Sequence, residues 1–246
     1  MIWLNDVLTI MWKEFRELLF QRPNVRGGWI GLLIFIAVFG IYIPLQSGPS
    51  WVSSPLNLVY WTWVPFFMVS SVVADTFAGE RERHTLETLL ASRLSDRVIL
   101  FGKLCTSIAY GWGLTLVSLL LGLIAVNVVF SGQGFLMYPM HIAVGILVTS
   151  FLIAAFASCL GVLVSLRAAT ARSAQQTLSV LVLAPMVLLL AAPALPEAWR
   201  ESVVSWAMTA GVERLVIVGG AFLLVINLAL LAADVKRFQR TKMILD

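Results

Sequence analysis

The stretch GERERHTLETLLASR, residues 79–93, is the most polar part of an apolar chain. Six of its fifteen side chains are charged: Glu80, Arg81, Glu82, Arg83, Glu87 and Arg93. Long apolar stretches precede it and follow it. This charged segment, as residues 79–93 are called below, therefore separates two predicted membrane spans and marks a place where the chain leaves the bilayer.

The composition of the whole chain is that of a polytopic membrane protein. Of its 246 residues, 60% are hydrophobic and 12% are charged, and soluble domains carry about twice that charged fraction. Both cysteines, Cys105 and Cys159, lie in apolar stretches away from the two histidines. This favours reduced packing residues over a disulfide or a metal site. We expect one all-α integral membrane domain over residues 1–246.

Hydropathy predicts six transmembrane helices, because a span needs about 20 apolar residues. They cover residues 28–46, 56–78, 98–130, 139–166, 175–194 and 211–234. Residues 1–26 are different. On a helix, Lys13, Arg16 and Glu17 fall on one side, while the apolar side chains lie largely away from them. This pattern predicts an amphipathic helix in the membrane surface, with a frayed cytoplasmic helix as the alternative.

The basic residues predict the orientation of these spans. All but two of the 17 Lys and Arg residues fall in the N-terminal tail, in the C-terminal tail, or in and beside the loops that follow spans two and four. Such residues accumulate on the cytoplasmic side, so both termini are predicted to be cytoplasmic and the number of spans even. The two exceptions are Arg200 and Arg214. Between spans five and six, residues 195–210 are too polar to cross, and they predict short re-entrant helices on the outer side. The net charge of +4 thus follows the topology, and no nucleic-acid surface is expected.

Motifs for catalysis or for nucleotide binding are missing from the sequence. It has no phosphate-binding loop, no Gly-x-Ser-x-Gly elbow and no His-Glu-x-x-His helix. We therefore predict neither a catalytic residue nor a metal site, and no cofactor bound by this chain. Asp75 and Asp234 lie near the cytoplasmic ends of their spans, where their charges are expected to reach water. A weak set of substrate-pathway candidates consists of Thr62, Ser70, Tyr110, Thr115 and Asn227, although ordinary hydrogen bonding between helices is the favoured explanation for these residues.

The charged segment has the pattern of a helix with two faces. Gly79 is expected to end span two, and the following leucines recur at helical spacing. We predict a helix over residues 79–95 with a leucine stripe and a charged stripe. It either rests on the lipid boundary or docks into the groove of another protein, where leucines serve as anchors and charges set the register.

Residues 74–103, ADTFAGERERHTLETLLASRLSDRVILFGK, resemble the signature of the type-2 ATP-binding-cassette (ABC) transporter permeases. The residues that match are Phe77, Gly79, Glu80, Arg81, Glu82, Thr85, Leu86, Glu87, Leu89, Leu90, Leu94, Ser95, Gly102 and Lys103. The chain departs from the pattern at His84, where the family usually has Gly, and at Arg93, where Pro is common. Both changes concern the local bend. The predicted order of elements is also similar to that of the family.

The resemblance implies a permease subunit of an exporter in the bacterial cytoplasmic membrane, surrounded by membrane lipid. Two such permeases, as a homodimer or with a homologue, would form the pathway, and two ATPase subunits would bind ATP and Mg. The helix after span two would be the coupling helix, and the loop after span four a second contact. The implied ATPase-coupling residues are Glu80, Arg81, Glu82, Arg83, Thr85, Leu86, Glu87, Leu89, Leu90, Arg167 and Arg172.

The sequence does not name a substrate. Outer aromatic residues slightly favour an amphipathic or lipid-like cargo, although an interfacial aromatic belt accounts for them better. Permeases for haem or cytochrome maturation and for copper-enzyme assembly remain alternatives, with accessory periplasmic or membrane proteins. A stand-alone secondary carrier or channel is an alternative of another class. It would need ionisable groups at mid-membrane or a polar pore stripe, and neither is evident in the sequence.

Overall fold

The computed structural model describes residues 2–20, 25–54, 57–191, 196 and 212–238. Within these residues the chain is helical and contains no strand. The longer helices are α1 (Ile2–Phe20), α2 (Val25–Ala37), α5 (Asn57–Val73), α8 (Asp96–Val129), α9 (Met140–Arg167), α10 (Ala171–Ala191) and α12 (Val212–Arg237). Short helices connect them: η1 (Val38–Tyr42), α3 (Ile43–Ser47), α4 (Ser50–Ser53), α6 (Ala78–Glu82), α7 (Leu86–Leu90) and η2 (Ser131–Gln133).

Four of the described helical stretches are long and apolar enough to cross a membrane. They are Ile30–Ser47, Asp96–Val129, Met140–Arg167 and Val216–Arg237. The chain is therefore an all-helical, multi-pass membrane protein. Helix α8 has 34 residues, which is about 50 Å at 1.5 Å per residue and exceeds the hydrocarbon thickness of a bilayer. It begins at Asp96 because the Ser95 side chain caps the backbone N–H of Val98 at 3.4 Å.

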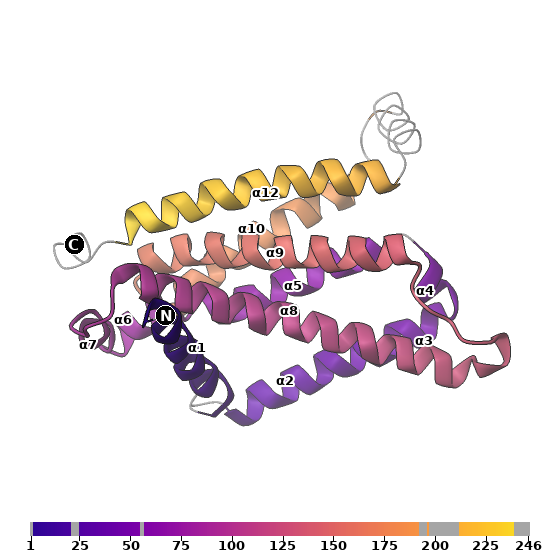
Figure 1. The fold of residues 1–246 in the computed structure, drawn as a ribbon, viewed down its shortest axis with the longest axis horizontal. Helices are drawn as coiled ribbons and strands as arrows, with labels where there is room; N and C mark the ends of the chain where they lie inside the picture. The colour runs from indigo at the N-terminus through magenta and orange to yellow at the C-terminus, as the bar shows by residue number, and fades with distance from the viewer. Residues whose placement is uncertain (1, 21–24, 55–56, 192–195, 197–211, 239–246) are drawn as a thin grey trace.

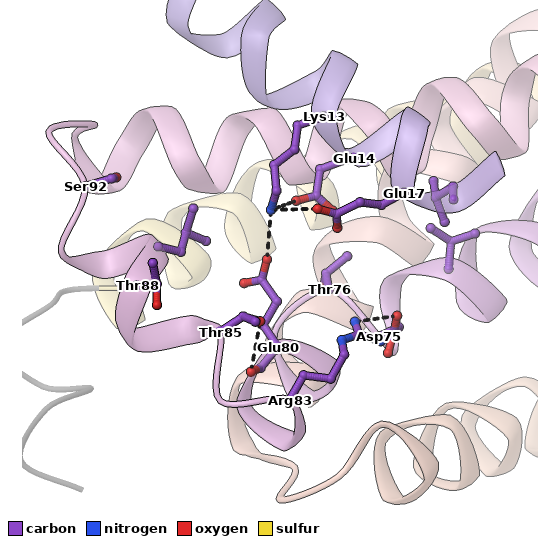
Figure 2. A pocket seen from close by; sticks show the side chains of 13 residues that line it. Lys13, Glu14, Glu17, Asp75, Thr76, Glu80, Arg83, Thr85, Thr88 and Ser92 are labelled. Atoms are coloured by element: carbon purple, nitrogen blue, oxygen red, sulfur yellow. Dashed lines mark hydrogen bonds and ion pairs between the residues drawn. The ribbon is translucent and has the colours of Figure 1, made fainter. Parts of the chain in front are cut away.

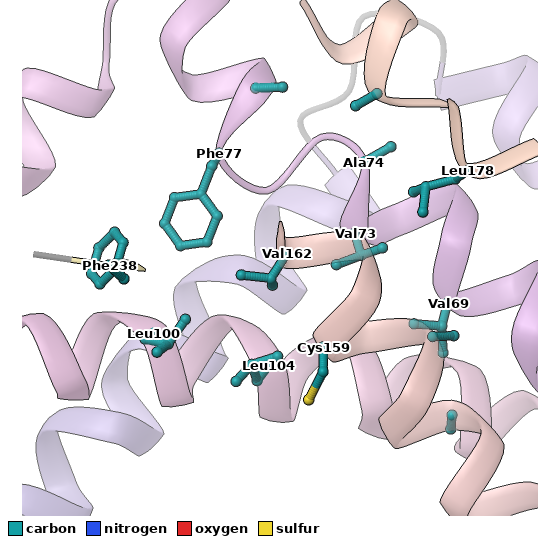
Figure 3. Close-up of a cluster of buried hydrophobic side chains, with 14 of the residues drawn as sticks. Val69, Val73, Ala74, Phe77, Leu100, Leu104, Cys159, Val162, Leu178 and Phe238 are labelled. Carbon is teal, nitrogen blue, oxygen red and sulfur yellow. The ribbon is translucent and has the colours of Figure 1, made fainter. Parts of the chain in front are cut away.

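Helix α9 is the centre of the packing and contacts α5, α8, α10 and α12. It approaches α5 closely because Gly161 has no side chain, and a Cβ there would overlap Val73. Around this crossing lies the larger apolar core, in which Val73, Leu104 and Val162 are almost fully buried (Figure 3). Because the side chains in this core are closely packed, there is little room for a side chain of another size.

The surface helix α1 packs across α8, and its contact depends on a second glycine. Ile10 lies over Gly102, where a Cβ would come within 2.6 Å of an Ile10 methyl group. The buried face of α1 is formed by Val7, Ile10 and Glu14. Another face exposes three large apolar side chains one turn apart: Leu4, Leu8 and Trp12. Helix α1 thus packs one face against the protein, and the described residues leave its apolar face with Leu4, Leu8 and Trp12 exposed.

The two ends of the helical bundle are built differently (Figure 1). At the end called the α6–α7 end below, helices α1, α6 and α7 lie together with the last residues of α12. The other, the α3–α4 end, carries helices α3 and α4 and the connection between α8 and α9. The re-entrant helices predicted over residues 195–210 lie outside the described residues, apart from Pro196.

Candidate functional site

The charged segment forms two short helices instead of the single helix predicted over residues 79–95. Helices α6 (Ala78–Glu82) and α7 (Leu86–Leu90) are joined by a turn in which His84 has φ 55°. This left-handed conformation interrupts the helix, and it is disfavoured for residues with a Cβ. It is closed by Glu80, whose carbonyl oxygen accepts the backbone N–H of Thr85 at 2.9 Å. His84, which stands where the signature that residues 74–103 resemble usually has glycine, is therefore the residue of this turn with a positive φ.

Gly79 was predicted to end span two, but this prediction is wrong. Helix α5 already ends at Val73, and Gly79 lies within α6. The absence of a side chain at Gly79 instead allows close packing of its neighbours. A Cβ at this position would overlap the Asp75 carboxylate and approach Arg83. These two residues form an ion pair at 3.0 Å across the turn. Gly79 is thus required for close approach, which is a packing role that hydropathy does not reveal.

A buried lysine connects three helices beneath the charged segment. Lys103 on α8 is 1% exposed. Its ammonium donates to Glu14 Oε1 at 2.8 Å, to Glu80 Oε1 at 2.9 Å and to the carbonyl oxygen of Thr76 at 2.9 Å. It also lies 5.3 Å from the centre of the Phe77 ring. Since an ammonium has three N–H donors, Lys103 is saturated, and we call Lys103, Glu14 and Glu80 the lysine hub.

Lys13 on α1 extends the lysine hub towards solvent (Figure 2). Its ammonium lies 3.2 Å from Glu17 and 3.5 Å from both Glu14 and Glu80. Burial alone would raise the pKa of Glu14, but the charge of Lys103 and its hydrogen bond, assisted by Lys13, lower this pKa below its ordinary value. Burial alone would lower the pKa of Lys13, yet the three glutamates raise it above its ordinary value. Glu14 and Lys13 are therefore both charged at neutral pH.

Helix α6 is also bound to the connection between α9 and α10. Arg81 donates to the carbonyl oxygens of Ala168 and Leu166 at 2.6 and 3.0 Å, at the end of α9. Glu82 accepts the backbone N–H of Ala171 at 3.1 Å, where α10 begins. Each charge suits the helix end that it meets, since cations favour C-termini and anions favour N-termini. The two segments predicted as separate contact sites thus form one surface.

A serine completes this attachment inside the bundle. The Ser165 hydroxyl on α9 is fully buried. It accepts the backbone N–H groups of Phe77 and Ala78 at 3.1 and 2.9 Å and donates to the carbonyl oxygen of Ala74 at 3.0 Å. It satisfies the backbone where the chain turns from α5 into α6, which would otherwise be left unpaired in an apolar core.

The predicted coupling residues divide into an outer and an inner group. Glu82, Arg83, Thr85, Glu87, Arg167 and Arg172 are exposed, and Arg81 and Leu89 are partly buried. Glu80 and Leu86 are buried at 5% and 7% exposure. Glu80 was predicted as a docking charge and Leu86 as an anchor in a partner's groove, but their side chains are used within this chain. The side chain of Leu90 lies outside the described part.

The predicted pathway residues contribute to helix packing. Thr115 is buried and donates to the carbonyl oxygen of Gly111 on its own helix. Asn227 on α12 donates to the carbonyl oxygen of Leu152 on α9 at 3.0 Å. Ser70 is buried, and Tyr110 is partly buried. The side chain of Thr62 lies outside the described residues. None of these candidates is among the described residues that line the pocket at the α6–α7 end, which lies between α1 and the charged segment.

Glu14 and Ser165 were not singled out from the sequence, Lys103 was noted only as a match to the signature, and Asp234 was given a wrong environment. Lys103 and Glu14 had a weak signal, because each interrupts an apolar helical face. Ser165 had none, since a serine in a span is commonplace. Asp234 was expected to reach water, but it is fully buried in α12 beside the thiol of Cys159. Among the described residues, no three His, Cys, Asp or Glu side chains are placed to hold a metal ion.

Comparisons with known proteins do not identify a family for this chain. No family model matches the chain, and no curated protein matches it. Function must therefore be argued from the charged segment and from what it contacts.

Proposed function

We propose that this chain is the transmembrane permease subunit of an ATP-binding-cassette exporter. One observation carries the proposal: the charged segment and the α9–α10 connection, joined by Arg81 and Glu82, form one polar surface at one end of the spans. A surface of this kind suits docking of a separate cytoplasmic ATPase. ATP and Mg would be bound by that partner, because the chain itself has no phosphate-binding motif.

The topology in this proposal has six spans. Helices α5 (17 residues) and α10 (21 residues) would cross the membrane beside the four candidate spans named above. The distribution of Lys and Arg supports a cytoplasmic α6–α7 end, with both termini on that side of a bacterial cytoplasmic membrane. The apolar face of α1, with Leu4, Leu8 and Trp12, supports a position in the membrane surface.

The mechanism follows from the contacts of α6. Movement of an ATPase against the exposed residues of the charged segment and of the α9–α10 connection would displace α6. The lysine hub links α6 to α8 and α1, and Ser165 and Arg81 link it to α9. These directional bonds would carry the displacement into several spans as a two-state rearrangement. Two permease copies would enclose the pathway, for a substrate that the sequence does not name and for which an amphipathic or lipid-like molecule is one candidate.

Charge reversal at the exposed surface tests this proposal. We expect Glu87→Lys together with Arg172→Glu to abolish co-purification with an ATPase subunit, because both side chains are exposed at the α6–α7 end. Arg214→Glu is the matched control, since Arg214 is exposed at the start of α12, at the far end of the molecule. The wild-type complex should contain two permeases and two ATPases. A transporter that works with this chain as its only protein would refute the proposal.

A further inference from the structure

A pocket of about 550 Å³ opens at the α6–α7 end between α1 and the charged segment (Figure 2). Four carboxylates and two basic groups line it: Glu14, Glu17, Asp75, Glu80, Lys13 and Arg83. Hydroxyl groups and a few apolar side chains form the rest of the lining. The pocket is thus polar, carries both signs of charge and is much larger than a water molecule requires.

One atom at the base of this pocket lacks a partner. Glu80 Oε1 accepts from Lys103 and from Lys13. Glu80 Oε2 is buried and accepts no hydrogen bond from any described residue. Lys103 cannot supply one, because its three N–H groups are already used. A carboxylate oxygen without a donor is costly to bury, so a ligand that donates an N–H to Glu80 Oε2 would remove this cost.

The charges favour a donor that is a cation. Four carboxylates line the pocket, while Lys13, Arg83 and the underlying Lys103 supply three positive charges. One negative charge in this group is therefore not balanced. The side chains of Lys13 and Arg83 are 45% and 48% exposed. They lie where a second, anionic part of the same ligand could pair with them.

We propose that this pocket binds the headgroup of a phospholipid that carries a primary ammonium. The ammonium donates to Glu80 Oε2, and the phosphate meets Lys13 and Arg83 at the rim. A lipid is the source because the pocket lies beside α1, whose exposed Leu4, Leu8 and Trp12 suit a membrane surface. The inference rests on the proposed position of α1 in that surface. A trimethylammonium headgroup has no N–H and cannot satisfy Glu80.

Native mass spectrometry of the purified chain tests the inference without any ATPase. Ethanolamine, N-methyl, N,N-dimethyl and choline phospholipids with identical acyl chains are titrated in turn. Binding should weaken stepwise as N–H groups are removed, and the choline lipid should bind about tenfold more weakly than the ethanolamine lipid. Equal binding of the two would overturn the proposal while leaving the ATPase hypothesis intact. Soluble phosphoethanolamine that bound as tightly as the lipid would show a free-amine site and overturn the assignment to a lipid.

Substitutions locate the effect in the pocket. Glu80→Gln should abolish the preference for the ethanolamine headgroup, and Glu17→Gln at the rim should reduce it. Glu87→Gln is the matched control, because Glu87 is exposed on α7 and lies outside the described lining of the pocket. Where Glu80→Gln fails to fold, the headgroup series on the wild-type chain decides alone. A preference that survives in both Glu80→Gln and Glu17→Gln would place the lipid elsewhere and contradict the proposal.

Discussion

The α6–α7 end and the α3–α4 end of the bundle are held together by different forces. At the α3–α4 end, Trp51 and Trp61 pack edge to face, 5.8 Å apart, within a cluster of apolar side chains. Burial there raises the pKa of Tyr138 to about 12. At the α6–α7 end, the lysine hub, Ser165 and Arg81 bind the helices through charges and directional hydrogen bonds.

The two kinds of contact constrain the helices differently. Apolar packing depends on buried area and close fit, and it has little directional preference. Hydrogen bonds and ion pairs specify a register, because a small displacement breaks them. The α6–α7 end is thus held in one defined register by directional bonds, while apolar burial dominates the α3–α4 end.

Removing the buried lysine should have the largest effect. Lys103→Met leaves Glu14 and Glu80 buried without their shared cation, which should destabilise the protein by about 3–5 kcal/mol. Thermal unfolding in detergent, followed by tryptophan fluorescence, measures the loss. The triple variant Lys103→Met, Glu14→Gln, Glu80→Gln should recover part of it, since it removes the unpaired charges as well. Wild-type stability in Lys103→Met would mean that the hub is not a stabilising connection.

Adding a methyl group to α6 should come next. Gly79→Ala places a Cβ against Asp75 and Arg83, and such overpacking destabilises proteins by about 1–3 kcal/mol. Gly113→Ala on α8 is the control, because no described atom lies within 4 Å of its added Cβ apart from the helix's own backbone and its two chain neighbours. The same unfolding assay compares the two variants. Equal melting temperatures would contradict the close approach at Gly79.

Two polar clamps, one at each end, permit a direct comparison. Ser165→Ala leaves two backbone N–H groups unpaired in the core and should destabilise the protein by about 1–3 kcal/mol. The side-chain amide of Asn127 forms two hydrogen bonds with the backbone of Leu136, each 2.8 Å long. Asn127 is only partly buried. Asn127→Ala should therefore have the smaller effect, confined in hydrogen exchange to residues near 136. An equal loss, spread over α5 and α9 in both variants, would remove the distinction between the ends.

Acid should weaken the α6–α7 end first. The pKa of Glu14 is lowered in the folded protein, so its contribution to stability is complete above the ordinary pKa of 4.5. That contribution is lost as the pH falls through the folded pKa. Unfolding measured between pH 3 and 7 should show a smaller acid loss in Glu14→Gln than in the wild type. Identical pH profiles would mean that Glu14 does not titrate with folding.

The smallest predicted effect is a gain. His84 has φ 55°, which costs roughly 1 kcal/mol for a residue with a Cβ. His84→Gly should therefore raise the free energy of unfolding slightly, and His84→Ala should not. Glycine adds flexibility to the unfolded chain, which offsets part of the gain. A melting temperature that falls in His84→Gly as much as in His84→Ala would show that the turn carries no strain.

The sequence predicted the helical class and the main spans because hydropathy depends only on local composition. It also singled out residues 79–93 as the unusual segment. It failed on the roles of Glu80, Leu86 and Asp234, because burial depends on partners distant in the chain. Lys103 lies 89 residues from Glu14, and no spacing rule connects them. Gly79 and Ser165 belong to the same class, since their purpose appears only when two helices meet.

The orientation of the α6–α7 end is the claim on which the account depends most. Single cysteines at Ser92, on the charged segment, and at Ser131, at the opposite end, can be labelled in intact cells with an impermeant maleimide. The wild-type chain is the control, because Cys105 and Cys159 lie within long apolar helices. We expect labelling of the Ser131 site from outside and of the Ser92 site only after permeabilisation. Labelling of the Ser92 site in intact cells would place the charged segment out of reach of any cytoplasmic ATPase and contradict the account.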